Sequence, residues 1–124
     1  MSHIHVDYKP KENITIFKVT GDLTISDILE YAEEYYLRKP TKLVLWELTK
    51  PTIHKIDTQE FKLLVKKMKK FTEHREGGKT AFVGDFDSDY GMGRMYETLA
   101  SIEELPVSYR TFRNIEDAQA WLLR

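Results

Sequence analysis

KTAFVGDFDSDYGMGRMYETLASIEELPVSYRTF, residues 79–112, is the stretch that decides the fold of this chain. An apolar segment, Lys79 to Val83, runs into the polar sequence GDFDSDYGMGR, then a helical pattern and a second apolar segment follow. This order predicts two parallel strands joined by a helix, because parallel strands need a long crossover connection. Open α/β sheets bind ligands outside the carboxyl ends of their strands, so the loop after Val83 is the first place to expect a site.

The rest of the chain continues the same alternation of strands and helices. Apolar runs predict strands at residues 3–8, 14–19, 42–48, 80–83 and 107–112. Apolar residues spaced by three and four predict four helices. Helix-start residues predict caps at Thr24 or Ser26, at Asp57 and at Asn114. The order β-β-α-β-α-β-α-β-α predicts a single α/β domain over residues 1–124, with a mostly parallel five-stranded sheet that begins with one antiparallel hairpin.

Composition narrows the classes of function. The 124 residues carry a net charge of -1, so a global field for nucleic-acid binding is not expected. The chain has no cysteine, which excludes disulfides, thiolate metal sites and cysteine nucleophiles. No apolar run approaches the roughly 20 residues that span a bilayer. The start MSHIHVDY has neither a basic leader nor an apolar core, so we expect a cytoplasmic protein. We also expect no cofactor.

Five sequence segments carry a resemblance that covers nearly the whole chain. They are VTGDLTISDILEY, KLVLWEL, GGKTAFVG, YGMGRMYETLA and YRTFRNIEDAQAWLL. In this order they resemble the STAS-like proteins and, more narrowly, the SpoIIAA-like family. The resemblance implies a non-catalytic, regulatory or binding module in bacteria or archaea, related in shape to lipid-carrier folds. It implies a small apolar or amphipathic ligand, or a protein partner, and often a homodimer.

The resemblance also raises one alternative at the second helix. Phospho-switched anti-sigma antagonists carry Asp-Ser-Ser-Gly there, whereas this chain reads Ile56-Asp57-Thr58-Gln59. Thr58 therefore stands where the phosphorylated serine would be, and a phosphate suits a helix N-terminus. The glycine is missing, and Thr58 beside a capping aspartate is equally explained as ordinary helix-start chemistry.

The loop Gly84 to Gly91 supports three hypotheses. Its alternating aspartates suggest a calcium loop, but a glycine and a bidentate glutamate are out of place and a strand precedes it. GDFDS resembles the magnesium-nucleotide segment of thiamine pyrophosphokinases, which would make Asp85 and Asp87 the metal ligands of a phosphotransfer enzyme. The third is a ligand site at the carboxyl edge of the sheet, formed by Trp46, Tyr90, Gly91, Arg94 and Met95. Equally, this segment can be interpreted as a solvated turn, in which glycines such as Gly91 and Gly93 allow unusual backbone angles and the aspartates cap the following helix.

The remaining polar and aromatic residues have simpler interpretations. His3 and His5 alternate on one strand face, while His54 and His74 are isolated, so no metal site is expected. The lysines of the second helix, opposed by an acidic first helix, are typical of solvated helix backs or of a contact between protomers. The aromatic residues fit either a packed core or the lining of a cavity between the first three helices and the sheet.

Overall fold

The fold is built on one mixed sheet. The computed structural model describes residues 3–38, 40–48 and 57–124. The strands lie in sequence order across the sheet: β1 (His3–Lys9), β2 (Ile14–Thr20), β3 (Leu43–Leu48), β4 (Lys79–Gly84) and β5 (Ser108–Phe112). β1 pairs antiparallel with β2, and all other neighbours are parallel. The predicted hairpin and the mostly parallel sheet are confirmed.

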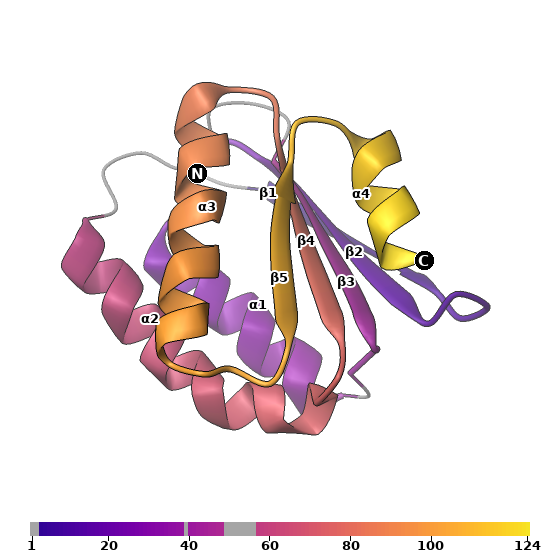
Figure 1. Cartoon of the computed structure of the whole chain (residues 1–124), viewed down its shortest axis with the longest axis horizontal. Coiled ribbons are helices and arrows are strands. Elements are labelled where there is room, and N and C mark those ends of the chain that lie inside the picture. The colour runs from indigo at the N-terminus through magenta and orange to yellow at the C-terminus, as the bar shows by residue number, and fades with distance from the viewer. Residues whose placement is uncertain (1–2, 39, 49–56) are drawn as a thin grey trace.

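Four helices and one short turn cover this sheet. They are α1 (Ile25–Leu37), α2 (Thr58–Thr72), the 3₁₀ turn η1 (Glu73–Arg75), α3 (Asp87–Ile102) and α4 (Ile115–Leu122). Sequential parallel strands with right-handed crossovers place the connecting helices on the same side, and α1, α2 and α3 lie together on one face (Figure 1). α4 follows the last strand and packs on the opposite face. No helix in the described ranges is both long and apolar enough to cross a membrane.

The predicted helix starts are confirmed for three helices. In α1 the Thr24 side chain accepts a hydrogen bond from the backbone of Asp27, whose carboxylate accepts one from Thr24. Asp57 and Glu60 make the same reciprocal pair at α2. Asn114 caps α4. Each cap satisfies backbone N–H groups that have no partner inside the helix.

The expected loop after β4 is wrong in its extent. β4 continues to Gly84 and α3 already begins at Asp87, with Phe86 in the cap position and no side-chain cap. Asp87 and Asp89 lie within the first turn of α3, where negative charge is favoured by the helix dipole. Tyr90 and Gly91 belong to the first turns of a helix rather than to a loop.

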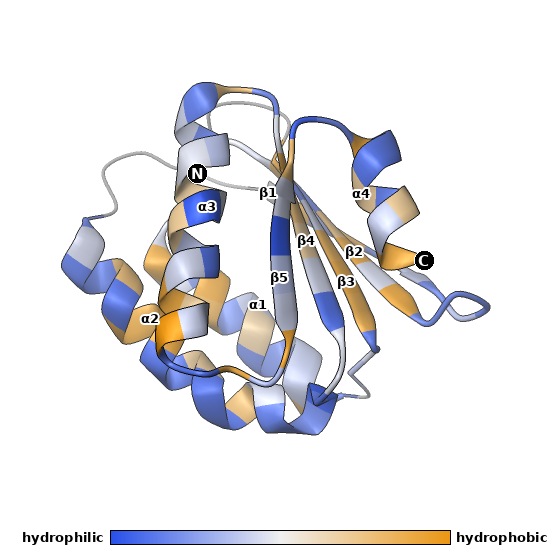
Figure 2. Cartoon of the chain, viewed as in Figure 1, coloured by the Kyte–Doolittle hydropathy of each residue, from blue (hydrophilic) through white to orange (hydrophobic). Residues whose placement is uncertain are grey.

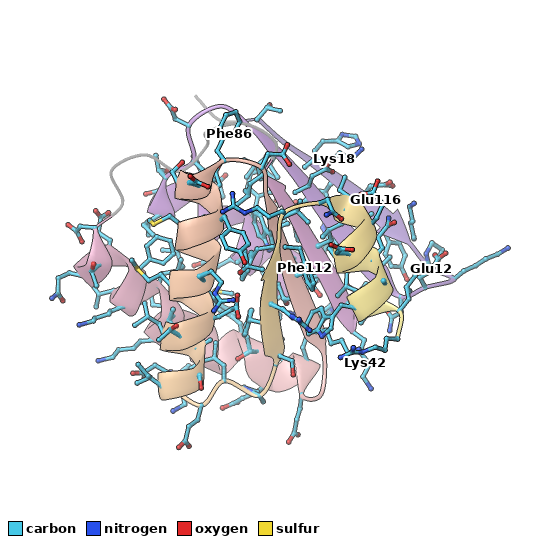
Figure 3. The ribbon with its side chains drawn as sticks, turned by 45° about the horizontal axis from the view of Figure 1, so that its top comes forward. Glu12, Lys18, Lys42, Phe86, Phe112 and Glu116 are labelled. Carbon is cyan, nitrogen blue, oxygen red and sulfur yellow. The ribbon has the colours of Figure 1, made fainter. Side chains whose placement is uncertain are left out.

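The two faces of the sheet form two separate cores. On the helix-rich face, one row across the strands consists of Phe17, Trp46 and Phe82. On the α4 face, the neighbouring row consists of Ile16, Leu45 and Ala81, which pack with Ala118, Trp121 and Leu122. Figure 2 shows hydrophobic residues along the central strands and hydrophilic ones on the outer side of α2. Phe112, the last residue of β5, has its ring 5.8 Å from that of Trp121 in α4 (Figure 3).

One glycine sets how closely α3 approaches the sheet. A Cβ atom on Gly93 would lie 2.7 Å from Cγ2 and 2.8 Å from Oγ1 of Thr111 in β5. Gly91, by contrast, would meet nothing within 4 Å. The positive-φ glycines are Gly21 and Gly77, so the expectation that Gly91 and Gly93 supply unusual backbone angles is wrong. Gly93 is needed for close packing instead.

Candidate functional site

A cavity lies between the sheet and the three helices α1, α2 and α3. Its volume is ≈ 80 Å³, well above the roughly 10–15 Å³ that one water needs. The lining is predominantly apolar and aromatic, with Phe17, Val44, Trp46, Leu48, Phe82 and Tyr109 from the sheet and Ala32, Tyr35, Tyr36, Phe61, Leu64, Met68, Met92 and Tyr96 among the helix residues.

Ring packing fixes the walls of this cavity. Phe17 and Trp46 stack with their centroids 4.3 Å apart and an interplanar angle of 15°. Tyr96 packs edge-on against Phe82 at 5.3 Å and tilts against Tyr109 at 5.1 Å. Rings in contact restrict one another's rotamers. The positions of the lining side chains are therefore fixed by contacts with one another as well as by the backbone.

Arg75 gives the cavity a polar end. It is contributed by η1 and is only 6% exposed, near the amino ends of β3 and β4. Its guanidinium donates to three backbone carbonyls, those of Thr41 (2.8 Å), Lys42 (3.1 Å) and Lys79 (2.9 Å). It also donates to the hydroxyls of Thr80 (3.0 Å) and Tyr36 (3.4 Å). No carboxylate is among these partners, so hydrogen bonds stabilise the buried positive charge without an opposite full charge.

Tyrosine side chains surround this cation. Tyr35 donates to the carbonyl of Thr41 and accepts from its N–H, each at 2.8 Å, and its ring lies 5.9 Å from the guanidinium. Burial raises the pKa values of Tyr36, Tyr96 and Tyr109, while the positive charge of Arg75 opposes the rise. Since tyrosine ionises near pH 10 when unperturbed, these hydroxyls stay protonated at neutral pH. At the polar end of the cavity, the Tyr36 hydroxyl keeps its proton and can donate it, whereas Tyr35 already donates to Thr41.

The predicted ligand residues do not gather in this cavity. Trp46 lines it, but Tyr90, Gly91, Arg94 and Met95 are absent from the lining. Arg94 is exposed, with its Nε 3.9 Å from Glu97 Oε2, and the Tyr90 ring lies 4.0 Å from the Arg113 guanidinium. From α3, the lining takes Met92, Gly93 and Tyr96. The helix begins at Asp87, and its buried residues are Asp89, Gly93, Tyr96 and Ala100.

Sequence reasoning missed Arg75 and Tyr109 as site residues. The sequence did contain a signal for Arg75. This residue continues the three- and four-residue spacing of the buried side chains of α2, after Met68 and Thr72. An arginine on an inward stripe is unusual, since arginine is rarely buried unless its donors are satisfied. Tyr109 alternates inward along β5 next to Thr80, and neighbouring parallel strands place these two on the same face.

The two alternative sites lie elsewhere. Asp85 and Asp87 are exposed at the carboxyl end of β4, and Asp87 forms an ion pair of 2.8 Å with Arg113. In the part of the chain that the structure describes, no three His, Asp or Glu side chains are grouped so that they could hold a metal. Thr58 is the exposed first residue of α2, directly after its capping aspartate. Phosphorylation of Thr58 and magnesium binding by Asp85 and Asp87 stay predictions.

Of the histidines that the sequence analysis considered, His5 and His74 are exposed, and His54 lies outside the described residues.

Comparison with known proteins supports the fold. No protein-family profile matches the chain, and no curated protein matches it in sequence. Among solved structures, an uncharacterized protein of the DUF3478 family from Shewanella loihica PV-4, with a SpoIIAA-like fold, is similar. The TM-score is 0.58 at 17% sequence identity, over 98% of this chain and 93% of that one. The chain therefore has a SpoIIAA-like fold, as its sequence predicted, and this likeness concerns the fold alone.

Proposed function

We propose that this protein is a non-catalytic binding module whose cavity under α1, α2 and α3 holds a small, partly apolar ligand. One observation carries the proposal: an aromatic cavity of ≈ 80 Å³ that ends at a buried guanidinium without a carboxylate partner. Apolar pockets with a few placed polar groups are the usual form of small-molecule sites. The aromatic walls favour an alkyl group, and the Arg75 end favours an acceptor.

The chemistry of the polar end favours an anionic ligand over a neutral one. The Tyr36 hydroxyl accepts from Arg75, and no acceptor for its own proton is found among the described residues. A hydroxyl that accepts from a cation is a stronger donor, because hydrogen bonds in a chain polarise one another. A carboxylate there would accept from Tyr36 and lie close to the charge of Arg75 in a low-dielectric environment. A short-chain carboxylate is thus the ligand class that fits both the volume and the charge.

Calorimetry with two matched probes tests this function. Butyrate and its neutral isostere 1-nitropropane share an alkyl chain and a planar head with two oxygens. We expect butyrate to bind with a Kd of about 1 mM, or -4.1 kcal/mol, and about tenfold more tightly than 1-nitropropane, which lacks the charge. Equal affinity for both would remove the anion preference, and no heat with either would contradict binding in the cavity.

Two variants locate the binding. Ala32→Leu adds a side chain inside the cavity lining and is expected to abolish binding of both probes. Tyr36→Phe keeps the ring and removes the hydroxyl, and is expected to weaken butyrate while leaving 1-nitropropane nearly unchanged. Arg94→Met is the matched control, because Arg94 is exposed and outside the lining. Native mass spectrometry of the purified protein would then identify the molecule that co-purifies.

A further inference from the structure

A groove lies on the helix-rich face of the sheet, between α1 and the edge strand β1. Its volume is ≈ 380 Å³, and four of its lining residues are aromatic: Tyr8, Phe17, Tyr31 and Tyr35. Val6, which also lines it, and Tyr8 are 46% and 54% exposed. β1 has its main contacts with β2 and not with a helix. Clustered apolar side chains that stay exposed mark interaction sites, whereas single ones do not.

Contacts within the protein fix the base of this groove. The Tyr35 hydroxyl donates to the Thr41 carbonyl and accepts from the Thr41 N–H, each at 2.8 Å. The Tyr35 ring meets that of Phe17 edge-on, with the centroids 5.8 Å apart. The hydroxyls of Thr15 and Thr41 are hydrogen-bonded at 2.9 Å. The polar groups at the base are therefore satisfied internally, and the groove offers a ligand preformed ring surfaces, which lowers the ordering cost of binding.

The outer part of the groove matches one turn of a polyproline II helix. Tyr31, Tyr35 and Arg38 follow one another along α1 and its cap over about 10 Å. A polyproline II turn is about 9.3 Å long and repeats every three residues. The Tyr8 and Tyr31 hydroxyls have no hydrogen-bond partner among the described residues. They can therefore donate to the carbonyl groups that polyproline II leaves unpaired.

A strand added to β1 would occupy a different place. Strand addition uses the backbone groups at the edge, in the plane of the sheet. This groove is lined by side chains above that plane, since Val6 pairs with Phe17 and Tyr8 with Thr15 on the face that α1 shares. Proline has no N–H for an edge strand. Aromatic-lined grooves, by contrast, are the usual sites for proline-rich segments.

Charge along α1 favours a basic segment. Glu30, Glu34 and Arg38 are exposed and lie at four-residue spacing, on one side of the helix. Glu34 pairs with Arg38 at 3.0 Å, which leaves Glu30 without a basic partner among the described residues. The groove is therefore acidic beside Tyr31. A guanidinium placed there would gain attraction to the carboxylate and contact with the ring.

We propose that this groove binds a proline-rich segment of a partner protein, in the polyproline II conformation, with an arginine next to the prolines. The proline rings pack against Tyr8 and Tyr31, and the arginine lies beside Glu30. The site is independent of the proposed ligand, because Tyr8 and Tyr31 are outside the cavity lining, although Phe17 and Tyr35 form a wall of both spaces.

Three matched peptides test the proposal by fluorescence anisotropy with the full chain. RPPPPPR carries an arginine at both ends, so that either direction of binding is sampled. We expect it to bind with a Kd of about 0.2 mM. RAAAAAR, which lacks the proline rings, is expected to bind at least about tenfold more weakly. EPPPPPE, which reverses the charge, is expected to bind about fivefold more weakly.

Two variants with matched controls place the binding in the groove. Tyr31→Ala should weaken RPPPPPR at least about tenfold, because it removes a central ring. Phe86→Ala is its control, since Phe86 is an exposed aromatic residue outside the groove (Figure 3). Glu30→Gln should weaken RPPPPPR about threefold and not EPPPPPE. Its control is Glu33→Gln, which is exposed on the same helix but outside the row of Glu30 and Glu34.

Far-UV circular dichroism checks that each variant is folded, as expected for residues that are exposed or half-buried. Absence of binding by RPPPPPR, or equal binding of RAAAAAR, overturns the proposal. Tighter binding of RAAAAAR would point to strand addition at β1 instead. A loss with Tyr31→Ala no larger than with Phe86→Ala, or equal effects of Glu30→Gln and Glu33→Gln on RPPPPPR, would also contradict it.

Discussion

The two faces of the sheet are packed in different ways, although the same strands supply both. On the α4 face, Ile16, Leu45 and Ala81 meet one short helix and form a closed core. On the other face, the row Phe17, Trp46 and Phe82 meets three helices, and a cavity remains. Large rings beneath three helices leave more unfilled space than aliphatic side chains packed against one short helix. The difference agrees with the proposed division, in which one face provides stability and the other binds the ligand.

Charge follows the same division. The cavity face holds Arg75, with its hydrogen bonds to backbone carbonyls, and the buried tyrosines. The buried cluster beneath α4 is formed entirely by aliphatic side chains and Trp121. A buried cation in an otherwise apolar region costs stability unless its donors are satisfied, and the five hydrogen bonds of the Arg75 guanidinium satisfy them.

The largest effect is expected from removing the buried cation. Arg75→Met leaves the carbonyls of Thr41, Lys42 and Lys79 without this donor. We expect the free energy of unfolding to fall by about 3–5 kcal/mol, because each buried acceptor left without a partner costs about 1–3 kcal/mol. Urea denaturation measures it, with the exposed Arg94→Met as control. A loss as small as that of Arg94→Met would show that Arg75 is not the anchor of the cavity face.

Replacing one alanine on each face with leucine compares the packing of the two faces directly. Ala32 in α1 lines the cavity, whereas Ala118 in α4 is fully buried in the closed core. Both sit in helices, so replacing each with leucine changes helix propensity equally. We expect Ala118→Leu to cost roughly 1–3 kcal/mol through overpacking, and Ala32→Leu to cost less than about 1 kcal/mol, because the cavity offers room. Equal costs in thermal and urea denaturation would contradict a difference in packing between the faces.

Replacing each of two glycines of α3 with alanine tests how closely this helix packs against β5. Gly93→Ala places a methyl group 2.7 Å from Thr111, and should destabilise the fold by about 1–2 kcal/mol. Gly91→Ala meets open space and should stabilise it by about 0.5–1 kcal/mol, since alanine favours helix over glycine. Opposite signs in urea denaturation are the expected result. A stabilising Gly93→Ala would mean that α3 is free to move away from β5.

Alkaline pH should lower the stability of the protein through the buried tyrosines of the cavity face. The folded-state pKa values of Tyr36, Tyr96 and Tyr109 are raised by burial, so the folded protein holds these protons after the unfolded chain has released them. Their contribution to stability is complete below about pH 10 and declines as pH rises further. Urea midpoints measured from pH 8 to pH 12 would show the decline, and Tyr109→Phe should reduce its slope. A slope unaltered by this variant would place the titrating groups elsewhere.

The sequence was sufficient for the fold because its signals are local. Alternating apolar residues, the reciprocal caps at Thr24 and Asp57, and the order of elements all act over a few residues. The start of α3 was misjudged because Phe86 is not a capping residue, and GDFDSD has the composition of a turn.

The site was harder to predict because it depends on distant contacts. Trp46 was identified, but which face of α3 meets the sheet depends on where that helix begins and on the close approach at Gly93. Arg75 joins carbonyls 33 and 34 positions away in sequence, and no local pattern encodes such a contact. Whether aromatic residues close up or leave a cavity is likewise decided by the angles between helices.

The two tryptophans provide the most direct test of the central claim, that the three-helix face binds a small ligand and the α4 face does not. Trp46 lies in the cavity lining and Trp121 in the closed core, so each indole N–H signal in a ¹H–¹⁵N spectrum reports on one face. Titration with butyrate should shift the Trp46 signal in a saturable way and leave the Trp121 signal in place. A stationary Trp46 signal, or a saturable shift of Trp121 alone, would contradict the account.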